Sequence, residues 1–278
     1  FLYNQNSLLD VCHYDDFSII NDDVRNTDTL KNAIFKNDII IPLAAIVGAP
    51  ACEKDKSLST EVNQMQAENI SKWVSSSQMV LFPVTNSGYG IGKDDLFCDE
   101  NSPLNPISHY GITKVNAEKS LLSMGNVVAF RLATVFGVSN RMRTDLLVND
   151  FVYRACKDRS IVLFESHFKR NYIHIRDVCS VFLHAIDNYD SLKGETYNIG
   201  LSSANLSKIE LCQKIKEHIK DFEILESPIG KDPDKRNYIV SNDKIEKTGW
   251  NPNFSLDDGI KELIKAYKYI HTNRFVNV

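Results

Sequence analysis

Tyr110 and Lys114 are the two residues whose types and spacing best suit chemistry in this sequence. Positions four apart share one face of a helix, so the Lys114 ammonium can lie beside the Tyr110 phenol. A free tyrosine has a pKa of about 10, which is too high for a base at neutral pH. A neighbouring cation lowers the pKa of a phenol, and a bound nicotinium ring lowers it further. Tyr110 is therefore a candidate proton acceptor and donor.

The spacing of this pair is a weak signal when it is taken alone. With eleven tyrosines and 32 Lys and Arg among 278 residues, about one such basic pair is expected by chance. Three further tyrosines have a lysine four residues later: Tyr89/Lys93, Tyr153/Lys157 and Tyr189/Lys193. Glycines interrupt the first pair, the second is expected in a separate lobe, and the third lies in a polar loop. The context therefore favours Tyr110 and Lys114.

A hydroxyl residue ends the strand that precedes this pair. Residues 79–85 (MVLFPVT) are a predicted strand that ends on Thr85, and Tyr110 begins the predicted helix at 108–124. Ligands of open α/β sheets bind at the carboxyl ends of the strands, so Thr85 is placed to hydrogen-bond an oxygen near Tyr110. Alone, Thr85 is typical of a strand-end turn. Together with Tyr110 and Lys114 it predicts a catalytic site.

Strands and helices alternate along the first half of the chain. The sequence predicts strands at 17–20, 38–45, 79–85 and 127–136, and helices at 27–36, 60–76 and 108–124. The β-branched run at 38–45 is typical of a parallel strand buried on both faces. This order predicts an α/β fold with a doubly wound parallel sheet.

The pattern changes after Gly137 and predicts a smaller α/β lobe. Helices are expected at 144–158, 177–188, 207–220 and 256–270, and short strands at 161–164, 171–175 and 196–199. We therefore expect a first domain at 1–138 and a mainly substrate-binding lobe at 139–278, with 171–200 returning to the first domain.

Composition excludes several classes of protein. The formal net charge is −4 and the pI is about 6.0, which argues against a surface that binds nucleic acid. No apolar run approaches the roughly 20 residues needed to cross a bilayer, so no membrane contact is expected. The six cysteines form no C-x-x-C pair, and no Cys or His pair has metal-ligand spacing. The expectation is a cytoplasmic protein with reduced thiols and no metal.

In their order and spacing, these residues and several later motifs resemble the extended short-chain dehydrogenase/reductase family. The resemblance is to its NAD-dependent nucleotide-sugar epimerases and dehydratases, and it covers essentially the whole chain. Thr85, Tyr110 and Lys114 match the family's Ser/Thr, Tyr and Lys triad. Residues 131–137 (RLATVFG) resemble R-x-x-N-x-Y-G, 170–174 (RNYIH) resemble R-D-Y-I-H, and 197–200 (YNIG) match Y-N-I-G. Each motif is weak alone, but their sequence along the chain is specific.

The resemblance implies a nicotinamide cofactor, with NAD favoured over NADP, and a nucleotide-sugar substrate. The cofactor-binding residues that it implies are Asp23, Val24, Leu43, Ala44, Ala45, Asn63, Tyr110, Lys114 and Ala133. The substrate-binding residues that it implies are Asn86, Thr134, Arg170 and Arg236. Thr134 stands where the family has a substrate-contacting Asn. A homodimer through the helices that carry Asn63 and Tyr110 is expected by analogy.

One departure from the family pattern concerns the phosphate-binding loop. The family begins with a strand and a G-x-x-G-x-x-G loop, whose backbone amides hold the pyrophosphate. The sequence contains no such loop, and the glycine cluster at 88–93 (GYGIGK) matches neither this loop nor a P-loop. We therefore expect that roughly 30 residues of the family pattern are absent before Phe1, and that the chain as given binds NAD poorly.

The resemblance also narrows the reaction. Family dehydratases carry Asp-Glu after the triad Thr, where this sequence has Asn86-Ser87. The Glu of the family's decarboxylases is absent, and Gly88 replaces the Cys of a further epimerase class. We therefore expect 4-epimerisation through a 4-keto intermediate, by reversible hydride transfer. The alternatives are a reductase or dehydratase of the same family, a scaffold that keeps the cofactor without catalysis, and an inactive fragment.

Overall fold

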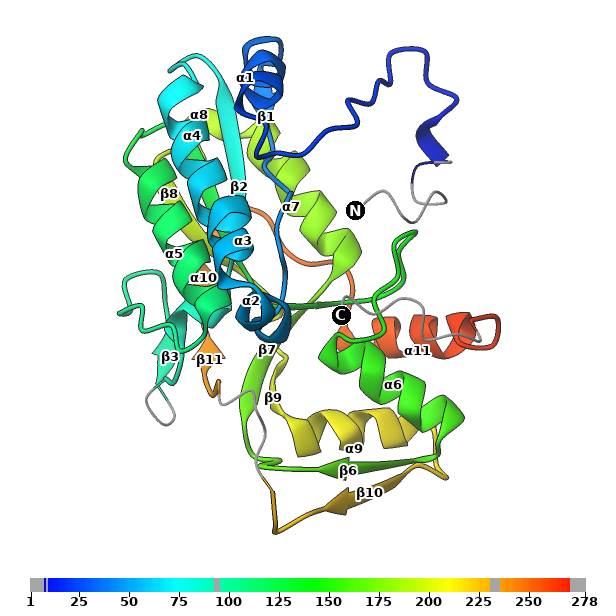
Figure 1. The fold of residues 1–278 in the computed structure, drawn as a ribbon. Coiled ribbons are helices and arrows are strands. Elements are labelled where there is room, and N and C mark those ends of the chain that lie inside the picture. The colour runs from blue at the N-terminus through cyan, green and yellow to red at the C-terminus, as the bar shows by residue number, and fades with distance from the viewer. Residues whose placement is uncertain (1–7, 9, 93–95, 231–235, 271–278) are drawn as a thin grey trace.

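A parallel sheet of four strands lies at the centre of the first half of the chain, with helices on both faces (Figure 1). The structure is a computed structural model that describes residues 8, 10–92, 96–230 and 236–270. The strands follow the spatial order β1 (Ile39–Ile40), β2 (Met79–Thr85), β4 (Val127–Leu132) and β8 (Glu195–Ile199). All neighbouring strands in this sheet are parallel. The predicted α/β fold is therefore confirmed.

Successive residues of the central strands face opposite sides of the sheet. Phe82 and Ala129 belong to a core with α4 (Gln66–Trp73) and α5 (His109–Leu122). Leu81 and Phe130 belong to a second core, which includes residues of α7 (Ile175–Asp187). Because both faces are covered, β2 and β4 are apolar at nearly every position, which made them recognisable in the sequence.

Several short helical segments lie before β2. They are α1 (Thr27–Phe35), α2 (Ala49–Lys54), α3 (Lys56–Thr60) and a π-helical turn (Glu61–Met65) that continues into α4. Asn26 and Asp55 begin α1 and α3, because their side chains accept hydrogen bonds from the backbone amides of Thr29 and Leu58. The helix predicted at 60–76 therefore begins earlier, at Lys56, and contains the π-helical turn.

Of the two strands predicted near the N-terminus, one is absent and the other is much shorter than predicted. Residues 17–20 form no strand and are exposed, with 64% of Ile20 accessible to solvent. Of the segment 38–45, only Ile39–Ile40 forms a strand, and Leu43 is 69% exposed. A strand needs a hydrogen-bonded neighbour on each side to be buried in a sheet, and among the described residues β1 pairs only with β2.

The remaining elements include three smaller sheets and further helices. In the three-stranded sheet β7 (Lys169–His174) lies between β5 (Thr134–Phe136) and β9 (Asn205–Ser207). The parallel pairs are β6 (Ser160–Leu163) with β10 (Glu223–Glu226), and β3 (Phe97–Cys98) with β11 (Ile239–Val240). The helices are α6 (Leu147–Lys157), α8 (Tyr189–Leu192), α9 (Lys208–His218), α10 (Asp243–Glu246) and α11 (Leu256–Ala266).

The strand predicted at 127–136 is divided at Ala133. The first part, β4, stays in the central sheet, whereas β5 leaves it and pairs with β7. In the segment 171–200, β8 joins the central sheet but β7 does not. The two larger sheets therefore meet where the chain passes through Ala133. The domain limits at 138 and 139 remain a prediction.

A buried histidine fixes the chain after β5. His174 Nδ1 accepts the backbone N–H of Arg176 at 3.2 Å, and its Nε2 donates to Glu262 of α11 at 2.8 Å. The same carboxylate accepts the N–H of Val138 at 3.3 Å. Gly137 has a φ of +111°, and a Cβ there would lie 2.6 Å from His174 Nε2. Only glycine fits this approach, which anchors the start of the loop that leads to α6.

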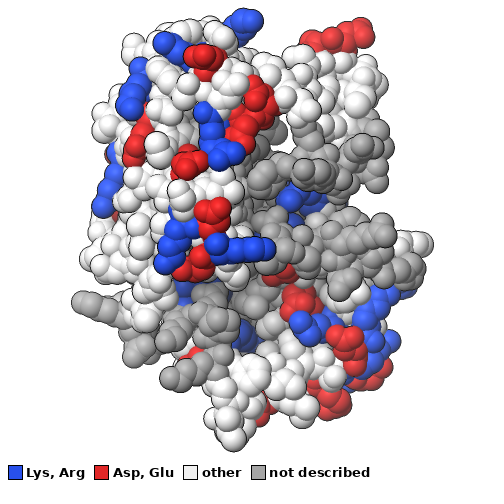
Figure 2. All heavy atoms as spheres, in the orientation of Figure 1, with Lys and Arg blue, Asp and Glu red and all other residues white. Residues whose placement is uncertain are grey.

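Charges of both signs are mixed on the face drawn in Figure 2, over the helices of the first half and over the smaller lobe. Within the described residues, no helix is both long and apolar enough to span a bilayer.

A buried ion pair joins α5 to the central sheet. The Arg131 guanidinium of β4 lies 2.9 Å from the Glu118 carboxylate of α5, and the two side chains are 8% and 2% exposed. Glu118 also accepts the hydroxyl of Thr196 at 2.9 Å, and Arg131 donates to the Tyr89 hydroxyl at 3.1 Å. The helix that carries Tyr110 and Lys114 is thereby fixed to the strand beside it.

Replacing Glu118 with Gln should destabilise the protein strongly, because the substitution leaves the Arg131 charge buried without its counter-ion. We expect the free energy of unfolding to fall by about 3–5 kcal/mol in urea denaturation. Asp150→Asn is the matched control, because it removes the more exposed pair with Arg154 on α6, which is worth about 0–1 kcal/mol. Equal losses for the two variants would contradict this account of the fold.

Candidate active site

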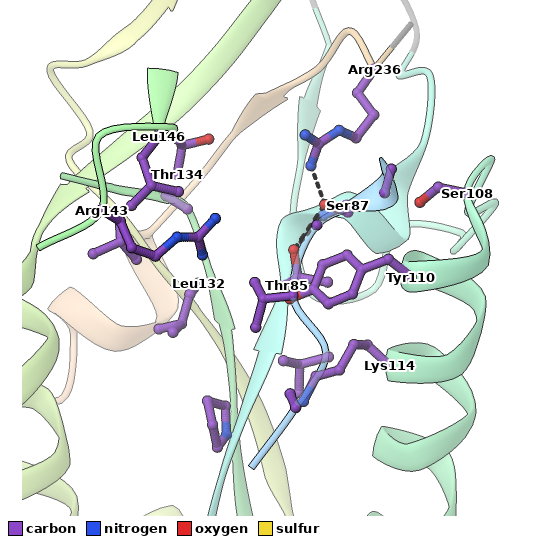
Figure 3. Close-up of a pocket in the computed structure, with 18 of the residues that line it drawn as sticks. Thr85, Ser87, Ser108, Tyr110, Lys114, Leu132, Thr134, Arg143, Leu146 and Arg236 are labelled. Carbon is purple, nitrogen blue, oxygen red and sulfur yellow. Dashed lines mark hydrogen bonds between the residues drawn. The ribbon is translucent and has the colours of Figure 1, made fainter. Parts of the chain in front are cut away.

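A cavity of about 320 Å³ opens at the carboxyl ends of β2 and β4, where the two larger sheets meet (Figure 3). Its walls come from the loop before α2, the end of β2, the start of α5, the passage from β4 to β5, the loop before α6 and the segment before β11. The lining residues are Leu43, Ala45, Val47, Gly48, Ala49, Pro83, Val84, Thr85, Ser87, Ser108, Tyr110, Lys114, Leu132, Ala133, Thr134, Val135, Arg143, Leu146, Arg236 and Tyr238.

Tyr110 enters the cavity from the first turn of α5. Ser108 starts this helix, because its hydroxyl accepts the N–H of Gly111 at 3.2 Å. A Cβ at Gly111 would lie 2.9 Å from the Pro106 Cβ and 3.3 Å from the carbonyl oxygen of Ser87. Glycine at this position therefore allows the helix to approach the end of β2, which brings the Tyr110 ring against Thr85 (Figure 3).

Three side chains beside Tyr110 form a hydrogen-bonded chain. The Thr85 hydroxyl donates to Ser87 Oγ at 2.9 Å, and Arg236 donates to the same Ser87 oxygen. The Ser87 backbone N–H donates to Thr85 Oγ1 at 3.1 Å, which holds the Thr85 side chain in place. Figure 3 shows this chain reaching from Arg236 toward the Tyr110 ring. The structure therefore brings Thr85, Tyr110 and Arg236 together, as the sequence predicts.

Lys114 lies one turn further along α5 and lines the same cavity. Its ammonium is 4.2 Å from the centre of the Phe82 ring, and its side chain is almost entirely buried. Burial lowers the pKa of Lys114 to about 7, and the nearby Glu118 carboxylate opposes this shift. The amine therefore loses its proton near neutral pH.

The expectation of an acidified phenol is wrong for this structure. Burial raises the pKa of Tyr110 to about 12, and the charges of Arg236 and Arg143 and a hydrogen bond with Thr85 oppose this rise. Lys114 was predicted to lower the pKa of the Tyr110 phenol. Because its own pKa is about 7, the lysine is only partly charged at neutral pH and cannot have this effect in full. Two arginines supply the positive charge that the sequence assigned to the lysine.

The residues predicted to contact the nicotinamide cofactor fall into two groups. Leu43, Ala45, Ala133 and Lys114 line the cavity together with Tyr110, whereas Ala44 and Asn63 do not. Small apolar side chains beside an amine and two hydroxyls fit a flat ring and a ribose, so these residues suit the nicotinamide half of the cofactor.

Asn63 acts one layer behind the cavity. Its amide accepts the backbone N–H of Ile46 at 2.8 Å and donates to the Ile46 carbonyl at 2.9 Å. The segment that follows Ile46 contributes Val47, Gly48 and Ala49 to the cavity wall. Asn63 therefore holds this wall in position rather than lining it.

Asp23 and Val24 do not line this cavity, and they belong to the segment that precedes α1. Both Asp23 carboxylate oxygens accept hydrogen bonds from the Arg25 guanidinium, at 3.0 and 2.9 Å. The pairing with Arg25 lowers the pKa of Asp23 to about 2. Of the predicted cofactor-binding residues, this pair is therefore not part of the cavity wall.

The predicted substrate residues are also divided. Thr134 and Arg236 line the cavity, whereas Asn86 and Arg170 are buried and do not line it. The Arg170 guanidinium lies 5.6 Å from the ring centre of Tyr238, whose side chain forms part of the wall. Arg170 therefore packs against Tyr238 and is not part of the cavity wall, although it was predicted to bind the substrate.

Arg143 is a wall residue that was not among the residues predicted for the site. The structure places Arg143 on the wall opposite α5, with its guanidinium pointing into the cavity (Figure 3). Its position shortly after Gly137 was the available signal, because a loop that leaves a strand end at this edge of a sheet lies over the ligand site. Ser87, Ser108 and Tyr238 are further wall residues that were not predicted.

The burial of Lys114 makes stability depend on pH. The unfolded chain keeps a proton on this lysine up to a pKa of about 10.4, whereas the folded protein releases it near pH 7. Between these values the unfolded state binds more protons, so the free energy of unfolding should rise with pH, by up to about 1.4 kcal/mol per unit. Urea denaturation at pH 7, 8 and 9 measures this rise.

Lys114→Met should remove this rise, and Lys119→Met, at an exposed position of the same helix, should retain it. A wild-type protein whose stability stays flat or falls from pH 7 to 9 would show that the lysine is charged when folded.

Two curated proteins illustrate what the chain resembles in sequence. It is 25% identical over 255 residues to the low-salt glycan biosynthesis protein Agl12 of Haloferax volcanii, which covers 88% of this chain and 80% of that protein. It is 23% identical over 261 residues to a putative UDP-glucose 4-epimerase of Methanocaldococcus jannaschii, with 90% and 83% covered.

A solved structure with the same fold is the dTDP-glucose 4,6-dehydratase of Bacillus anthracis in complex with NAD. The TM-score is 0.78 at 20% identity, with 97% of this chain and 84% of that chain covered. The NAD dependent epimerase/dehydratase family model matches residues 3–200, which is more than half of the sequence. The match takes in the strand that ends on Thr85 and the helix that carries Tyr110 and Lys114, and the chain belongs to the NAD dependent epimerase/dehydratase family.

Proposed function

We propose that this protein is a nucleotide-sugar 4-epimerase that works by reversible hydride transfer to NAD. The observation that carries the proposal is the meeting of Tyr110 and Thr85 in one cavity, with Lys114 a turn below them. A phenol and a second hydroxyl facing the same space can hold one sugar hydroxyl between them. This arrangement is suited to removing a proton from an alcohol as the alcohol is oxidised to a ketone.

The chain's own residues have separate tasks in this proposal. Leu43, Ala45 and Ala133 supply the wall for the nicotinamide, and Lys114 is placed to hold the ribose hydroxyls. A nicotinamide held by these residues would supply the acceptor and donor for the hydride of the sugar carbon. Tyr110 takes and returns the proton of the sugar hydroxyl, while Thr85 orients the same oxygen.

The positive charge around Tyr110 makes its phenol easier to deprotonate than burial alone would allow. Arg236 and Arg143 both act to lower the pKa of the phenol, against the effect of burial. Both lie on the cavity wall, so a substrate that excludes water strengthens their effect on the phenolate. Proton transfer to Tyr110 is then assisted by these two arginines and by the positive nicotinium ring.

The cavity supports epimerisation rather than loss of water. Elimination needs an acid and a base in addition to the tyrosine, and no Asp or Glu occurs among the described residues that line the cavity. Ser87 stands at one of the two family positions for this pair, and Asn86 at the other is buried outside the cavity wall. A ketone formed here can take the hydride back on its other face, which inverts carbon 4.

Tyr110→Phe should lower kcat by on the order of 10²- to 10⁴-fold, because it removes the group that accepts the proton. The measurement is interconversion of UDP-glucose and UDP-galactose with added NAD, together with calorimetric binding of the sugar nucleotide. Binding should remain within a few-fold of the wild-type value, since the ring is retained.

Tyr153→Phe is the matched control, because Tyr153 also precedes a lysine by four residues but lies on α6, outside the cavity. It should leave turnover unchanged. Net oxidation of a reduced nicotinamide by a keto-sugar, without interconversion of the two epimers, would instead identify a reductase and reject the proposal.

A further inference from the structure

A second cavity lies at the opposite end of α6 from the candidate active site. It has a volume of about 350 Å³ and lies where α6, α9 and α11 end, on the right-hand side of the smaller lobe in Figure 1. Helix α6 begins directly after Leu146, a wall residue of the active-site cavity, and its last two residues, Cys156 and Lys157, line the second cavity. A helix of 11 residues is about 16 Å long, and no described residue lines both cavities. The second cavity is therefore a separate place for a ligand.

Cations surround this second cavity. They are Lys157 at the end of α6, Arg159 in the turn that follows it, Lys220 after α9 and Lys268 after α11. The acid among the described wall residues, Asp221, is paired with Arg159 at 2.9 Å. Within the part of the chain that the structure describes, the three lysines form no ion pair with an acid. Their charges are thus available to a ligand.

These cations come from distant parts of the sequence and converge on one wall residue, Cys156. Burial raises the pKa of the Cys156 thiol, and the charges of Arg159, Lys157 and Lys268 oppose this rise. Charges at a protein surface act on one another mainly within about 10 Å, because salt screens them at longer range. Helices α6 and α11 therefore bring their terminal charges to the same side of the cavity.

The helix ends account for only part of this positive charge. A helix C-terminus carries roughly half a negative charge, which favours a cation beside it. Three helices end at the cavity, and Asp221 adds one carboxylate. This negative charge is smaller than the charge of the four cations. An excess of positive charge remains, and it favours an anion.

The backbone holds Arg159 in a conformation that residues with a side chain rarely adopt. Its φ is +57°, and glycine is the usual residue in this conformation after a helix. The turn is fixed by two hydrogen bonds, from the N–H of Arg159 to the carbonyl of Arg154 at 3.0 Å and from the N–H of Glu223 to the carbonyl of Arg159 at 2.8 Å. Strained positions of this kind cluster at ligand sites, where the side chain has a use.

Apolar side chains form another part of the wall. Ile219 and Tyr267 are buried in the main core, and Ile264 packs against it. The Tyr267 hydroxyl donates to the carbonyl of Asn149 at 2.9 Å, so the polar end of this residue is already bonded. An apolar wall bordered by cations fits a ligand that has both an apolar part and a phosphate group.

We propose that this second cavity binds a phosphate monoester with an apolar organic part. The three lysines hold the phosphate, and the apolar wall contacts the organic part. Inorganic phosphate has the charge without the apolar part, so it is the weaker ligand of the two. The proposal goes beyond the reaction assigned to Tyr110 and does not depend on it.

The first test titrates the full chain with phenyl phosphate and with inorganic phosphate by calorimetry. Phenyl phosphate should bind about tenfold more tightly, because its ring is removed from water. The double substitution Lys157→Gln and Lys268→Gln should weaken phenyl phosphate binding by about tenfold or more. Lys265→Gln is the matched control, because Lys265 is exposed in the last turn of α11 and does not line the cavity. It should keep the affinity within about twofold of wild type.

The second test locates the ligand through the thiol in the wall. Bound phenyl phosphate should slow the labelling of Cys156 by N-ethylmaleimide, a neutral reagent, as measured by mass spectrometry of peptides. Cys179 is the internal control, because it is an exposed thiol on α7 outside the cavity, and its labelling should not change. Arg236→Gln alters the active-site cavity and should retain the protection of Cys156.

Equal affinities for the two phosphates would overturn the proposal, and so would equal effects of the double substitution and of Lys265→Gln. Labelling of Cys156 that phenyl phosphate does not slow would also overturn it. Protection that disappears with Arg236→Gln would place the ligand in the active-site cavity and reject the second site. Each measurement is independent of turnover, so failure here leaves the proposed epimerase unaffected.

Discussion

The buried pair of Glu118 and Arg131 is the interaction on which the site depends. It joins α5 to β4, and its removal from water is compensated by further hydrogen bonds from Thr196 and to Tyr89. Tyr110 and Lys114 lie on α5, whereas Leu132 and Ala133 continue β4 into the cavity wall. The distance between Tyr110 and the opposite wall is therefore set by a contact that itself lies outside the cavity.

The site exists because two sheets meet at Ala133. The central sheet supplies the strand ends that carry Thr85 and Leu132, and the sheet of β5, β7 and β9 redirects the chain toward α6. His174 and Glu262 fix this second direction from the side of α11. Residues far apart in the sequence, such as Thr85 and Arg236, thereby share one cavity.

Burial has opposite effects on the two titrating groups of the site. It raises the pKa of Tyr110 and lowers that of Lys114, since each is driven toward its neutral form. Burial thus disfavours the charged form of both side chains, the phenolate of Tyr110 and the ammonium of Lys114. Cationic neighbours then decide how readily the phenol loses its proton. Arg236 and Arg143 are such neighbours, which connects substrate binding to the proton transfer that is proposed for Tyr110.

The sequence by itself determined the parallel sheet, the helix with Tyr110 and Lys114, and the strand that ends on Thr85, because strands buried on both faces are apolar throughout and helix caps are local. It predicted a strand at 17–20 that does not form and a strand at 38–45 that is only Ile39–Ile40 long, since apolar composition does not reveal whether a neighbouring strand is present. Only the tertiary structure decided that Arg143 lies inside the cavity, that Arg170 lies behind Tyr238, and that the lysine loses charge. Each of these outcomes depends on the packing of distant segments, which sets burial and charge and which spacing along the chain does not encode.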